Sequence, residues 1–441
     1  EESTVETPLN EQLNRLAKTI TKASYIIATL VVIGRLLIFF LTSSSGEREI
    51  LDIIHVIINS VMLAVTLIVV TVPEGLPMSV TISLALSMRK MLKEKNLVRK
   101  LHACETMGAT TVICTDKTGT LTYNKMSVVK QEFSGVEMDF MALSISINST
   151  AELSDDESGK LRVIGNPTEG ALLLWLNGLG YDYRALRASL TIISQEPFST
   201  ETKKMITVAK DEGTDKIVRY IKGAPEIVLE MSDSIAGNRA KEEIISHLEN
   251  YQARGMRTLG FAYQEMDIEE APVIFAGIVG IADPVRDDVR EAIDICRNNA
   301  GVRVIMITGD VALTANEISR QSGIMETHEP MQVLTGAEFA LMSDEEIKTR
   351  VIPELKVLSR ARPEDKARLV TLLQEMGEVV AVTGDGTNDA PALKKAQVGL
   401  SMGDGTSRAK EASDITIIDN SFTSINKGIL WGRSLYLNIK R

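Results

Sequence analysis

Residues 111–122 read TVICTDKTGTLT, in which a short apolar run rich in β-branched residues ends at Asp116. Two later stretches have the same form, since residues 304–310 read VIMITGD and residues 379–385 read VVAVTGD. Continuous apolar strands are typical of a parallel sheet that is covered on both faces. Ligands of such sheets bind beyond the carboxyl ends of the strands. We therefore expect Asp116, Asp310 and Asp385 to lie together at one edge of one sheet.

The long separation between the first of these runs and the others predicts an inserted domain. Short strand-like runs at 205–208 and 217–220 and a helix-like run after residue 170 give the intervening stretch its own pattern. Residues 154–160 read SDDESGK and predict a polar surface loop. We therefore expect an α/β domain formed by residues 101–130 and 276–425, with an α+β domain at 131–275 inserted into it. Residues 398–402 and 415–418 predict two more strands of the first sheet.

Two apolar runs near the start of the sequence, at 25–42 and 53–72, are each about long enough to cross a bilayer. The alternative is a pair of buried core helices. Basic residues before the first run and after the second, and few in the link between them, place both ends of the hairpin in the cytoplasm. We therefore expect residues 1–100 to form two membrane helices with their stalks, in contact with a lipid bilayer.

The composition narrows the function classes. The chain has 441 residues and a net charge of −11, which argues against general nucleic-acid binding because that requires basic surfaces. Its three cysteines and four histidines form no cluster with zinc-ligand spacing. The signature G-x-x-x-x-G-K-[ST] is absent from the sequence, which disfavours a P-loop nucleotidase.

The stretch from Asp116 to Thr122 has the features of a nucleophilic site. A carboxylate at the end of a strand can attack a phosphorus atom, and the backbone N–H groups of the following glycine-containing turn can bind phosphoryl oxygens. Lys117 adds positive charge next to the nucleophile. An isolated D-K-T-G would be an ordinary surface turn, but seven matching residues at a strand end favour the catalytic interpretation.

These seven residues, DKTGTLT, resemble the phosphorylation signature of the P-type ATPases, which belong to the haloacid-dehalogenase-like superfamily. The resemblance implies that Asp116 is phosphorylated by ATP. Related phosphatases often carry a second Asp two residues after the nucleophile as a general acid, whereas this chain has Thr118 there. Without that acid, the aspartyl-phosphate should persist, as a pump requires.

The resemblance extends to the other two strand ends. It implies that Asp385 binds Mg²⁺ together with the Asp116 carboxylate and the Thr118 carbonyl, a hard oxygen set of the kind Mg²⁺ prefers. It also implies that Thr308 binds the phosphoryl oxygens and that Lys366 neutralises the transferred phosphate. The remaining residues of these motifs that we assign to the catalytic site are Gly309, Asp310, Asn388 and Asp389, and Arg360 matches a nucleotide contact.

The inserted domain resembles the nucleotide-binding domain of the same family. In the motif PFST, Phe198 resembles the aromatic residue on which adenine stacks. In KGAPE, Lys222 lines the adenine pocket and is followed by Gly223. Further expected ATP contacts are Glu169, Arg257 and, on weaker grounds, Lys203.

Residues 72–77 read VPEGLP and interrupt an apolar run that resumes at residue 78. Two prolines and a glycine break a helix, and unwound backbone at membrane depth is tolerated where its carbonyls line a cavity. The alternative is a proline kink with Glu74 at the interface. The stretch resembles the fourth membrane helix of plasma-membrane-type calcium pumps. This implies that Glu74 and the carbonyls of Val69, Val70 and Val72 coordinate the transported ion, with Ca²⁺ favoured and manganese or another divalent ion left open.

The sequence contains no T-G-E tripeptide, which the family's actuator domain carries. We expect a catalytic fragment that runs from the third membrane helix to the start of the fifth stalk at 426–441, and that requires the actuator domain and the later helices for transport. Two other hypotheses stay open, namely a membrane-anchored haloacid-dehalogenase-like phosphatase and a non-catalytic nucleotide-binding protein.

Overall fold

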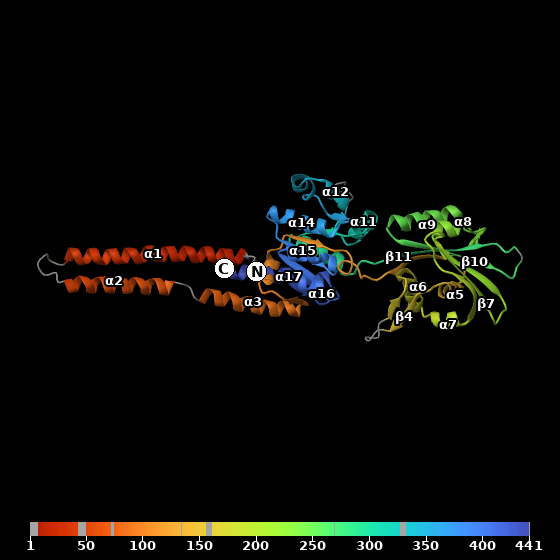
Figure 1. The fold of residues 1–441 in the computed structure, drawn as a ribbon, viewed down its shortest axis with the longest axis horizontal. Helices are drawn as coiled ribbons and strands as arrows, with labels where there is room; N and C mark the ends of the chain where they lie inside the picture. Colours follow the sequence, from red (N-terminus) through yellow and green to blue (C-terminus); the bar gives the residue numbers. More distant parts are fainter. Residues whose placement is uncertain are drawn as a thin grey trace.

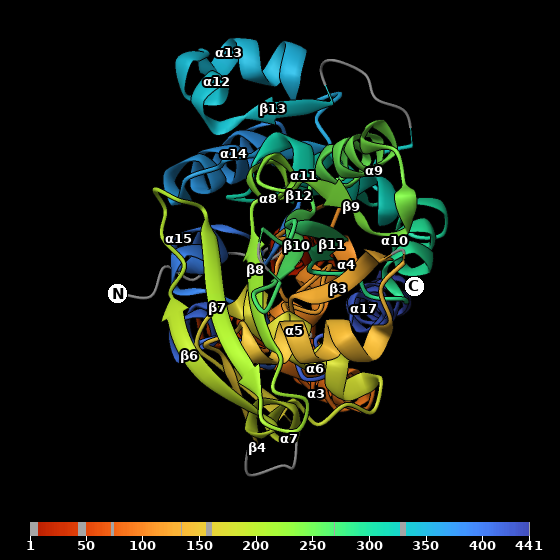
Figure 2. The same ribbon diagram turned by 90° about the vertical axis from the view of Figure 1, so that its right-hand side faces the viewer.

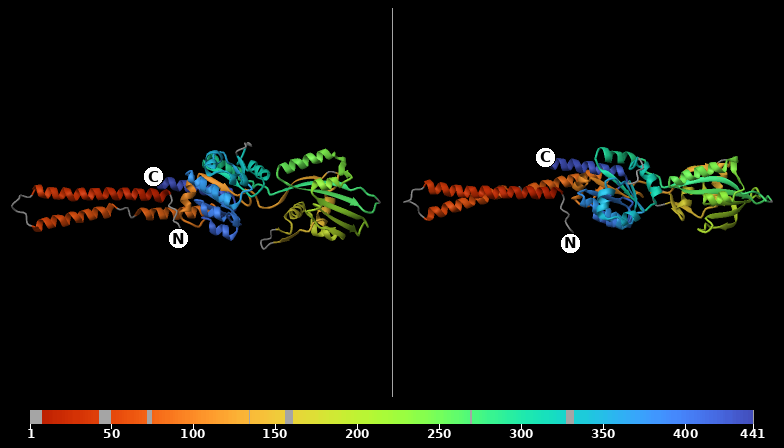
Figure 3. Two further views of the ribbon diagram at one scale, coloured as in Figure 1. Left: turned by 45° about the horizontal axis from the view of Figure 1, so that its top comes forward. Right: turned by 90° about the horizontal axis from the view of Figure 1, so that it is seen from above.

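The structure is a computed structural model that describes residues 8–42, 50–71, 75–133, 135–155, 161–268, 270–326 and 332–440. The molecule is elongated: a long helical hairpin lies at one end, an α/β domain in the middle and a second domain at the other end (Figure 1). We call the middle one the first domain and the distal one the second domain. In two further views the connection between these domains is narrow (Figure 3).

The hairpin consists of α1 (Pro8–Thr42) and α2 (Ile50–Thr71), which pack against each other. Within the described residues, Ala17–Leu41 and Ile53–Thr71 are long and apolar enough to cross a membrane, and only 11% and 6% of these stretches are buried. The alternative of two buried core helices is therefore not supported. The chain continues in α3 (Gly75–Lys93), which leads to the first domain.

The first domain is built on an eight-stranded sheet with the order β1-β17-β16-β15-β2-β12-β14-β13. All neighbours are parallel except the edge pair β1 and β17. The strands are β1 (Asn96–Val98), β2 (Val112–Thr115), β12 (Arg303–Ile307), β13 (Val333–Thr335), β14 (Val357–Ser359), β15 (Val380–Gly384), β16 (Val398–Met402) and β17 (Ile415–Ile417). The five strands expected from the sequence are present, whereas β1, β13 and β14 were not expected.

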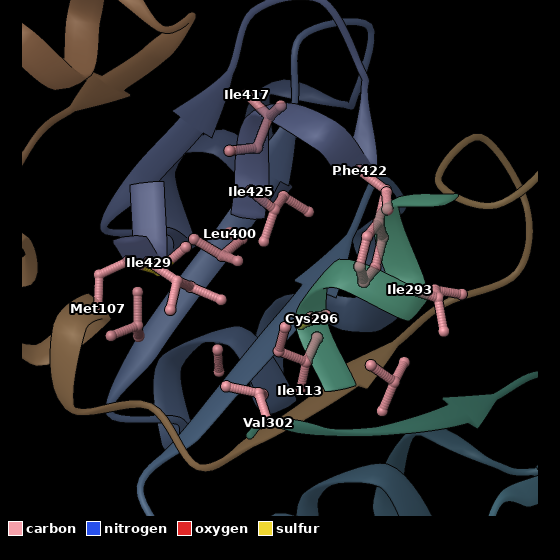
Figure 4. Close-up of a cluster of buried hydrophobic side chains, with 14 of the residues drawn as sticks. Met107, Ile113, Ile293, Cys296, Val302, Leu400, Ile417, Phe422, Ile425 and Ile429 are labelled. Carbon is pink, nitrogen blue, oxygen red and sulfur yellow. The ribbon is translucent and has the colours of Figure 1, made fainter. Parts of the chain in front are cut away.

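Helices cover both faces of this sheet. Alternate residues of each strand point to opposite sides, so apolar side chains of one strand pack in two separate clusters. Ile113 belongs to one buried cluster, together with residues of α4 (Ala103–Ala109), α10 (Val289–Asn298), α11 (Ala312–Gln321) and α17 (Phe422–Lys440). Figure 4 shows Ile113 beside Cys296 of α10 and near side chains of α17. Val112 and Cys114 belong to a cluster on the other face, with residues of α12 (Gly336–Leu341), α14 (Pro363–Glu375), α15 (Ala390–Lys395) and α16 (Ser407–Ala412).

The second domain contains an antiparallel sheet with the order β3-β11-β10-β8-β7-β6, with β9 (Ser234–Ile235) paired to β11. Its strands are β3 (Ser127–Phe133), β6 (Leu190–Glu196), β7 (Lys204–Asp211), β8 (Ile217–Gly223), β10 (Arg257–Glu265) and β11 (Ile274–Ala282). In the end-on view, α5 (Met138–Ile147) and α6 (Pro167–Gly178) lie on one side of the sheet (Figure 2). The helices α8 (Pro225–Glu230) and α9 (Lys241–Ala253) lie on the other.

The sheets divide the chain at slightly different points from those expected. Since β3 and β11 pair with each other, the second sheet includes residues 127–130 and 276–282, which we had assigned to the first domain. In the same way, β1 belongs to the first sheet rather than to a stalk, and α17 begins at Phe422 rather than at residue 426. Part of the expected surface loop also differs, because Ser154 and Asp155 pair in the hairpin of β4 (Glu152–Asp155) and β5 (Leu161–Ile164). Residues 156–160 lie outside the described residues.

Candidate active site

The three aspartates predicted to share one edge do so. Asp116 follows β2, Asp310 comes after β12 and Asp385 follows β15, and these are three neighbouring parallel strands. Carboxylate oxygens of Asp116, Asp385 and Asp389 all lie within 4.8 Å of one another. Asp310 belongs to a second charged group at the same edge, described below.

Asp116 is held from two sides. Its backbone N–H donates to Thr383 Oγ1 at 3.0 Å, and Lys366 Nζ donates to its Oδ1 at 2.8 Å. The same ammonium group donates to Asp389 Oδ1 at 2.6 Å. Burial raises the pKa of Asp116, and the charge of Lys366 opposes this shift. Burial alone would lower the pKa of Lys366, but Asp116 and Asp389 together raise it, so that Lys366 is a fixed positive charge.

Asp385 lies in the same group of carboxylates but has no ion pair among the described residues. Burial, and then the charges of Asp116 and Asp389, raise its pKa to about 6. Gly119 comes so close that a Cβ added there would lie 2.6 Å from Asp385 Oδ2, and the φ of this glycine is +70°. Only glycine therefore lets this turn approach the carboxylate.

The donor set fits a hard divalent cation. Three carboxylates surround a single lysine, Lys366, so the group has an excess of two negative charges when all three are ionised. Carboxylate and carbonyl oxygens are the ligands that Mg²⁺ prefers. Thr118 lies half-buried in the turn beside Gly119, at the same edge.

Lys117 belongs to the second charged group at this edge. Its Nζ lies 2.8 Å from Asp310 Oδ2 and 4.0 Å from Asp283 Oδ2. Thr308 is buried, and its Oγ1 accepts a hydrogen bond from the backbone N–H of Asp310 at 3.1 Å. The backbone N–H of Arg360, at the end of β14, donates to the Asp310 carbonyl at 2.9 Å. The structure therefore joins Lys117, Thr308, Asp310 and Arg360 in one set of loops, with Gly309 exposed between them.

Two polar residues of the motif at 385–389 differ in burial and in their contacts. Asp389 is buried and its Oδ2 accepts the N–H of Gly386 at 3.1 Å, which fixes it beside Lys366. Asn388 is exposed in the short helix Thr387–Asp389.

A cleft of about 570 Å³ separates this edge from the second domain. On one side it is lined by Lys117, Gly309 and Asp310, and on the other by Met256 and Arg257. Arg257 is exposed, and its guanidinium lies 3.4 Å from Thr168 Oγ1. The expected nucleotide contact Arg257 therefore faces the expected phosphorylation edge.

Lys222 and Glu169 form a buried ion pair in the second domain, with Nζ and Oε1 2.5 Å apart. Lys222 also donates to the Asn148 carbonyl at 2.6 Å, and Glu169 accepts the N–H of Thr150 at 2.8 Å. Burial lowers the pKa of Lys222, against the opposing effect of Glu169. Burial alone would raise the pKa of Glu169, but Lys222 and the hydrogen bonds from Thr150 outweigh it and lower that pKa.

The other expected nucleotide residues lie at one end of the second sheet. Phe198 is in the connection from β6 to β7 and is 52% exposed. Lys203 is exposed with a φ of +51°, and its carbonyl accepts the N–H of Ala224 at 2.9 Å. A Cβ added to Gly223 would lie 2.5 Å from that same carbonyl. Strand pairing brings Lys222 opposite Met205, two residues after Lys203, so these residues are neighbours across β7 and β8.

The expected ion ligands are described only in part. Val69 and Val70 lie in the last turn of α2, 58% and 78% exposed. Val72 and Glu74 lie outside the described residues.

Sequence reasoning missed several residues of the edge. Thr383 holds Asp116, and the repeat of T-G-D at 308–310 and 383–385 was the signal that could have indicated it. Asp283 joins the two domains, because its Oδ2 accepts from Thr122 Oγ1 at 2.5 Å and its Oδ1 from the N–H of Lys125 at 3.0 Å. Arg286 donates to the Thr122 carbonyl at 3.2 Å.

Comparisons with known proteins identify two matching families. Residues 138–288 match the family described as P-type ATPase, cytoplasmic domain N, and residues 366–429 match the haloacid dehalogenase-like hydrolase family. These matches confirm the expected fold class.

Similar proteins include the calcium-transporting ATPase PAT1 of Dictyostelium discoideum, 41% identical over 98% of this chain and 41% of that protein. The plasma membrane-type calcium-transporting ATPase 9 of Arabidopsis thaliana is 38% identical over 100% of this chain and 45% of its own length. The plasma membrane-type calcium-transporting ATPase 3 of Oryza sativa subsp. japonica is 40% identical over 99% of this chain and 46% of its own length. The chain therefore spans less than half the length of these relatives.

Proposed function

Because this chain belongs to the P-type ATPases, we propose that ATP phosphorylates Asp116 and that this step drives calcium transport across a membrane. The observation that carries the proposal is the Asp116 carboxylate, which is held by Lys366 among two further carboxylates. The next residue, Lys117, lines the interdomain cleft. A nucleophile, a fixed positive charge and a donor set for a divalent cation then lie at one place.

The proposed step transfers one phosphoryl group. Lys366 occupies Oδ1 of Asp116, which leaves Oδ2 to attack the γ-phosphorus of ATP. A new bond forms between this oxygen and phosphorus, the bond from phosphorus to the β,γ-bridging oxygen breaks, and ADP leaves with the electron pair. Lys366 stabilises the charge on the transferred group, and Thr308 with the N–H groups of the turn after Asp116 binds the phosphoryl oxygens.

We assign Mg²⁺ to Asp116, Asp385 and the Thr118 carbonyl, and Asp389 completes the negative surroundings. The ion would supply positive charge that offsets the repulsion between the carboxylates and the phosphates. Asp389 then has a positioning role, since it holds Lys366 next to Asp116. Lys117 orients Asp310 at the entrance of the cleft.

We assign ATP to the cleft and the adjoining end of the second sheet. Phe198, being exposed, is available to stack on adenine, while Lys222, Gly223 and Lys203 form the strand ends next to it. Arg257 and Arg360 would contact the phosphates or ribose from opposite sides of the cleft. Glu169 is fully engaged with Lys222 and Thr150, so we give it the role of holding Lys222 rather than of touching ATP directly.

The membrane part of the proposal rests on the apolar hairpin and on the names of the relatives. We propose an integral, multi-pass membrane protein with both domains in the cytoplasm. Ca²⁺ would be the transported substrate, bound by Glu74 and the carbonyls of Val69, Val70 and Val72. The actuator domain and the later membrane helices would be the partners required for dephosphorylation and for the complete ion site.

Labelling with ATP tests the proposal. Incubation with radiolabelled [γ-phosphate]ATP and Mg²⁺ should give a protein-bound label that is stable in acid and released by hydroxylamine. The label should disappear in Asp116→Asn and persist in Asp344→Asn, an exposed aspartate of the same domain. A label that survives Asp116→Asn would overturn the proposal, and release of phosphate from small esters without ATP would favour a phosphatase instead.

A further inference from the structure

The chain passes between the two domains twice, just before β3 and just after β11. The second domain also touches the first at a point that belongs to neither of these chain crossings. Gly255 lies in the turn between α9 and β10, and this turn rests against Thr314 in the first turn of α11. A Cβ added to Gly255 would lie 2.7 Å from both Cα and Oγ1 of Thr314. Such distances mean that the two backbones are in direct contact, with no side chain between them.

Charges of opposite sign flank this contact. Arg254, next to Gly255, is exposed, and Glu317 lies one turn after Thr314 with a side chain that is only 10% exposed. Glu317 also accepts hydrogen bonds from Arg320 and Gln321. Burial opposes ionisation of Glu317, but these hydrogen bonds and the charges of Arg320 and Arg254 lower its pKa. Arg254 and Glu317 both line the cleft, so their attraction draws the two domains together there.

The position of the contact gives it mechanical significance. The two chain crossings, just before β3 and just after β11, lie side by side and form a hinge. A hydrogen bond from Thr122 to Asp283 joins them. A hinge of this kind restricts translation but leaves one angle free. A third contact away from the hinge fixes that angle, because it stops the domains from closing further.

We propose that Gly255 and Thr314 form a positioning contact that sets how far the two domains close over the cleft. Arg257, two residues after Gly255, thereby faces Lys117 and Asp310 at a fixed separation. The inference rests on the proposed function, since the separation matters only for a nucleotide that binds to one domain and reacts on the other. Gly255 and Thr314 also line the cleft, so the first test is made without nucleotide.

The first test measures the interdomain distance without any nucleotide. Spin labels on Lys216→Cys in the second domain and Glu354→Cys in the first report the distance by pulsed electron paramagnetic resonance in the full 441-residue chain in detergent. The native Cys104, Cys114 and Cys296 are buried and should not compete for label. Gly255→Ala and, independently, Thr314→Gln should lengthen this distance, because each inserts atoms into the contact.

Backbone strain is controlled separately. Gly255 has a φ of +69°, so alanine there is strained as well as crowded. Gly180 has a φ of +91° with nothing within 4 Å of an added Cβ, so Gly180→Ala adds strain alone. Gly180→Ala should leave the distance unchanged. An unchanged distance in both Gly255→Ala and Thr314→Gln, or an equal change in Gly180→Ala, would refute the positioning role.

The second test compares two phosphate donors. ATP must span the cleft, whereas acetyl phosphate needs only the first domain. Gly255→Ala should lower the rate of Asp116 labelling from ATP by about tenfold or more, because a displacement of about 1 Å can cost on the order of 10² in rate. Labelling from acetyl phosphate should be unaffected. Equal losses with both donors would refute the inference, whereas absence of labelling in the unmodified chain would count against the proposed function and leave the distance test intact.

Discussion

The two domains each contain a buried lysine bound to carboxylates, and the two clusters differ in charge balance. In the second domain Lys222 faces one carboxylate, Glu169, and the pair is complete. At the edge of the first sheet Lys366 faces Asp116 and Asp389, with Asp385 close by. A balanced pair is satisfied by itself. At the other cluster, burial and then the neighbouring carboxylates raise the pKa of Asp385, and the excess of negative charge attracts a cation.

We interpret this difference as the one between a wall of the proposed nucleotide pocket and the proposed reaction centre. The lysine is buried in both clusters, so its burial does not distinguish them. The balance of charges does distinguish the clusters. Phosphoryl transfer requires positive charge that arrives with the substrate and its metal, and a cluster with excess negative charge can bind that metal. The following experiments test whether the balanced pair acts on stability and the unbalanced cluster on chemistry.

The largest effect should come from breaking the balanced pair. Lys222→Met leaves Glu169 buried without its counter-ion, which should destabilise the second domain by about 3–5 kcal/mol. Guanidinium unfolding followed by the fluorescence of Trp175, in a Trp431→Phe background, measures this in the second domain. The surface pair Lys210 and Asp215 supplies a matched control, because Lys210→Met leaves no buried charge unpaired and should cost far less stability. Adding Glu169→Gln to Lys222→Met should restore most of the loss, and a failure to restore it would count against a purely electrostatic pair.

The next effect concerns the reaction centre. Lys366→Met should reduce the rate of Asp116 phosphorylation by about 10²–10³-fold, the usual cost of removing one group that stabilises developing charge. Rapid-quench labelling with ATP measures the rate. Lys348→Met, which breaks an exposed ion pair with Glu375 in the same domain, is the control and should leave the rate unchanged. Comparable losses in the two variants would show that the charge at Lys366 has no special role.

A smaller effect should follow from the exposed aromatic residue. Phe198→Ala should weaken ATP binding by about 1–3 kcal/mol, the usual value for stacking of a base on an aromatic side chain. Calorimetric titration of ATP measures this. Ile193→Ala removes another exposed apolar side chain on the preceding strand and should leave the affinity unchanged. A similar loss in both variants would indicate a general surface effect rather than stacking.

The smallest effect is a dependence on pH that should differ between the clusters. The pKa of Asp385 is raised to about 6, so below pH 6 a proton occupies this carboxylate and must be displaced by Mg²⁺. The affinity for Mg²⁺ should therefore fall by up to about tenfold for each pH unit below 6, because metal ligands must be deprotonated. Calorimetry with Mg²⁺ at pH 5, 6 and 7 measures this trend.

Two controls test this pH dependence, one in each domain. Asp385→Asn should weaken Mg²⁺ binding and flatten its pH dependence. ATP binding to the second domain without Mg²⁺ should change little between pH 6 and 7, since the pKa of Glu169 is lowered. A steep pH dependence of Mg²⁺ binding that survives in Asp385→Asn would assign the titration to another group.

The sequence predicted the central part of the fold because its strands are long apolar runs. β2 and β15 each stand out as four or five consecutive buried residues that end at a conspicuous aspartate. β1, β13 and β14 have three residues each, which is too short for a pattern to be distinguished from a loop. The predicted domain boundaries differed from those in the structure by a few residues. The pairing of β3 with β11 is long-range and has no local signal in the sequence.

The candidate site was predicted mainly through the family resemblance. The contact between Lys366 and Asp116 joins residues 250 positions apart, and no local pattern contains it. Asp283 was missed for the same reason, since its role depends on which segments become neighbours, whereas the repeated T-G-D could have indicated Thr383. The assignment of Glu169 to ATP followed its motif, and its burial against Lys222 became visible only in the folded second domain.

The strand β1 gives the link from the hairpin to the first domain a particular mechanical character. Its residues Asn96–Val98 come shortly after α3 and lie antiparallel to β17, with flanking bonds from Arg99 to Asp414 and from Ile418 to Lys95. Hydrogen bonds in such a ladder run perpendicular to the strands. A pull along the strand therefore loads all of them at once in shear, instead of opening them one after another. In the proposed membrane arrangement, tension on the hairpin would enter the sheet at β1, four strands and roughly 19 Å from β2, the strand that precedes Asp116.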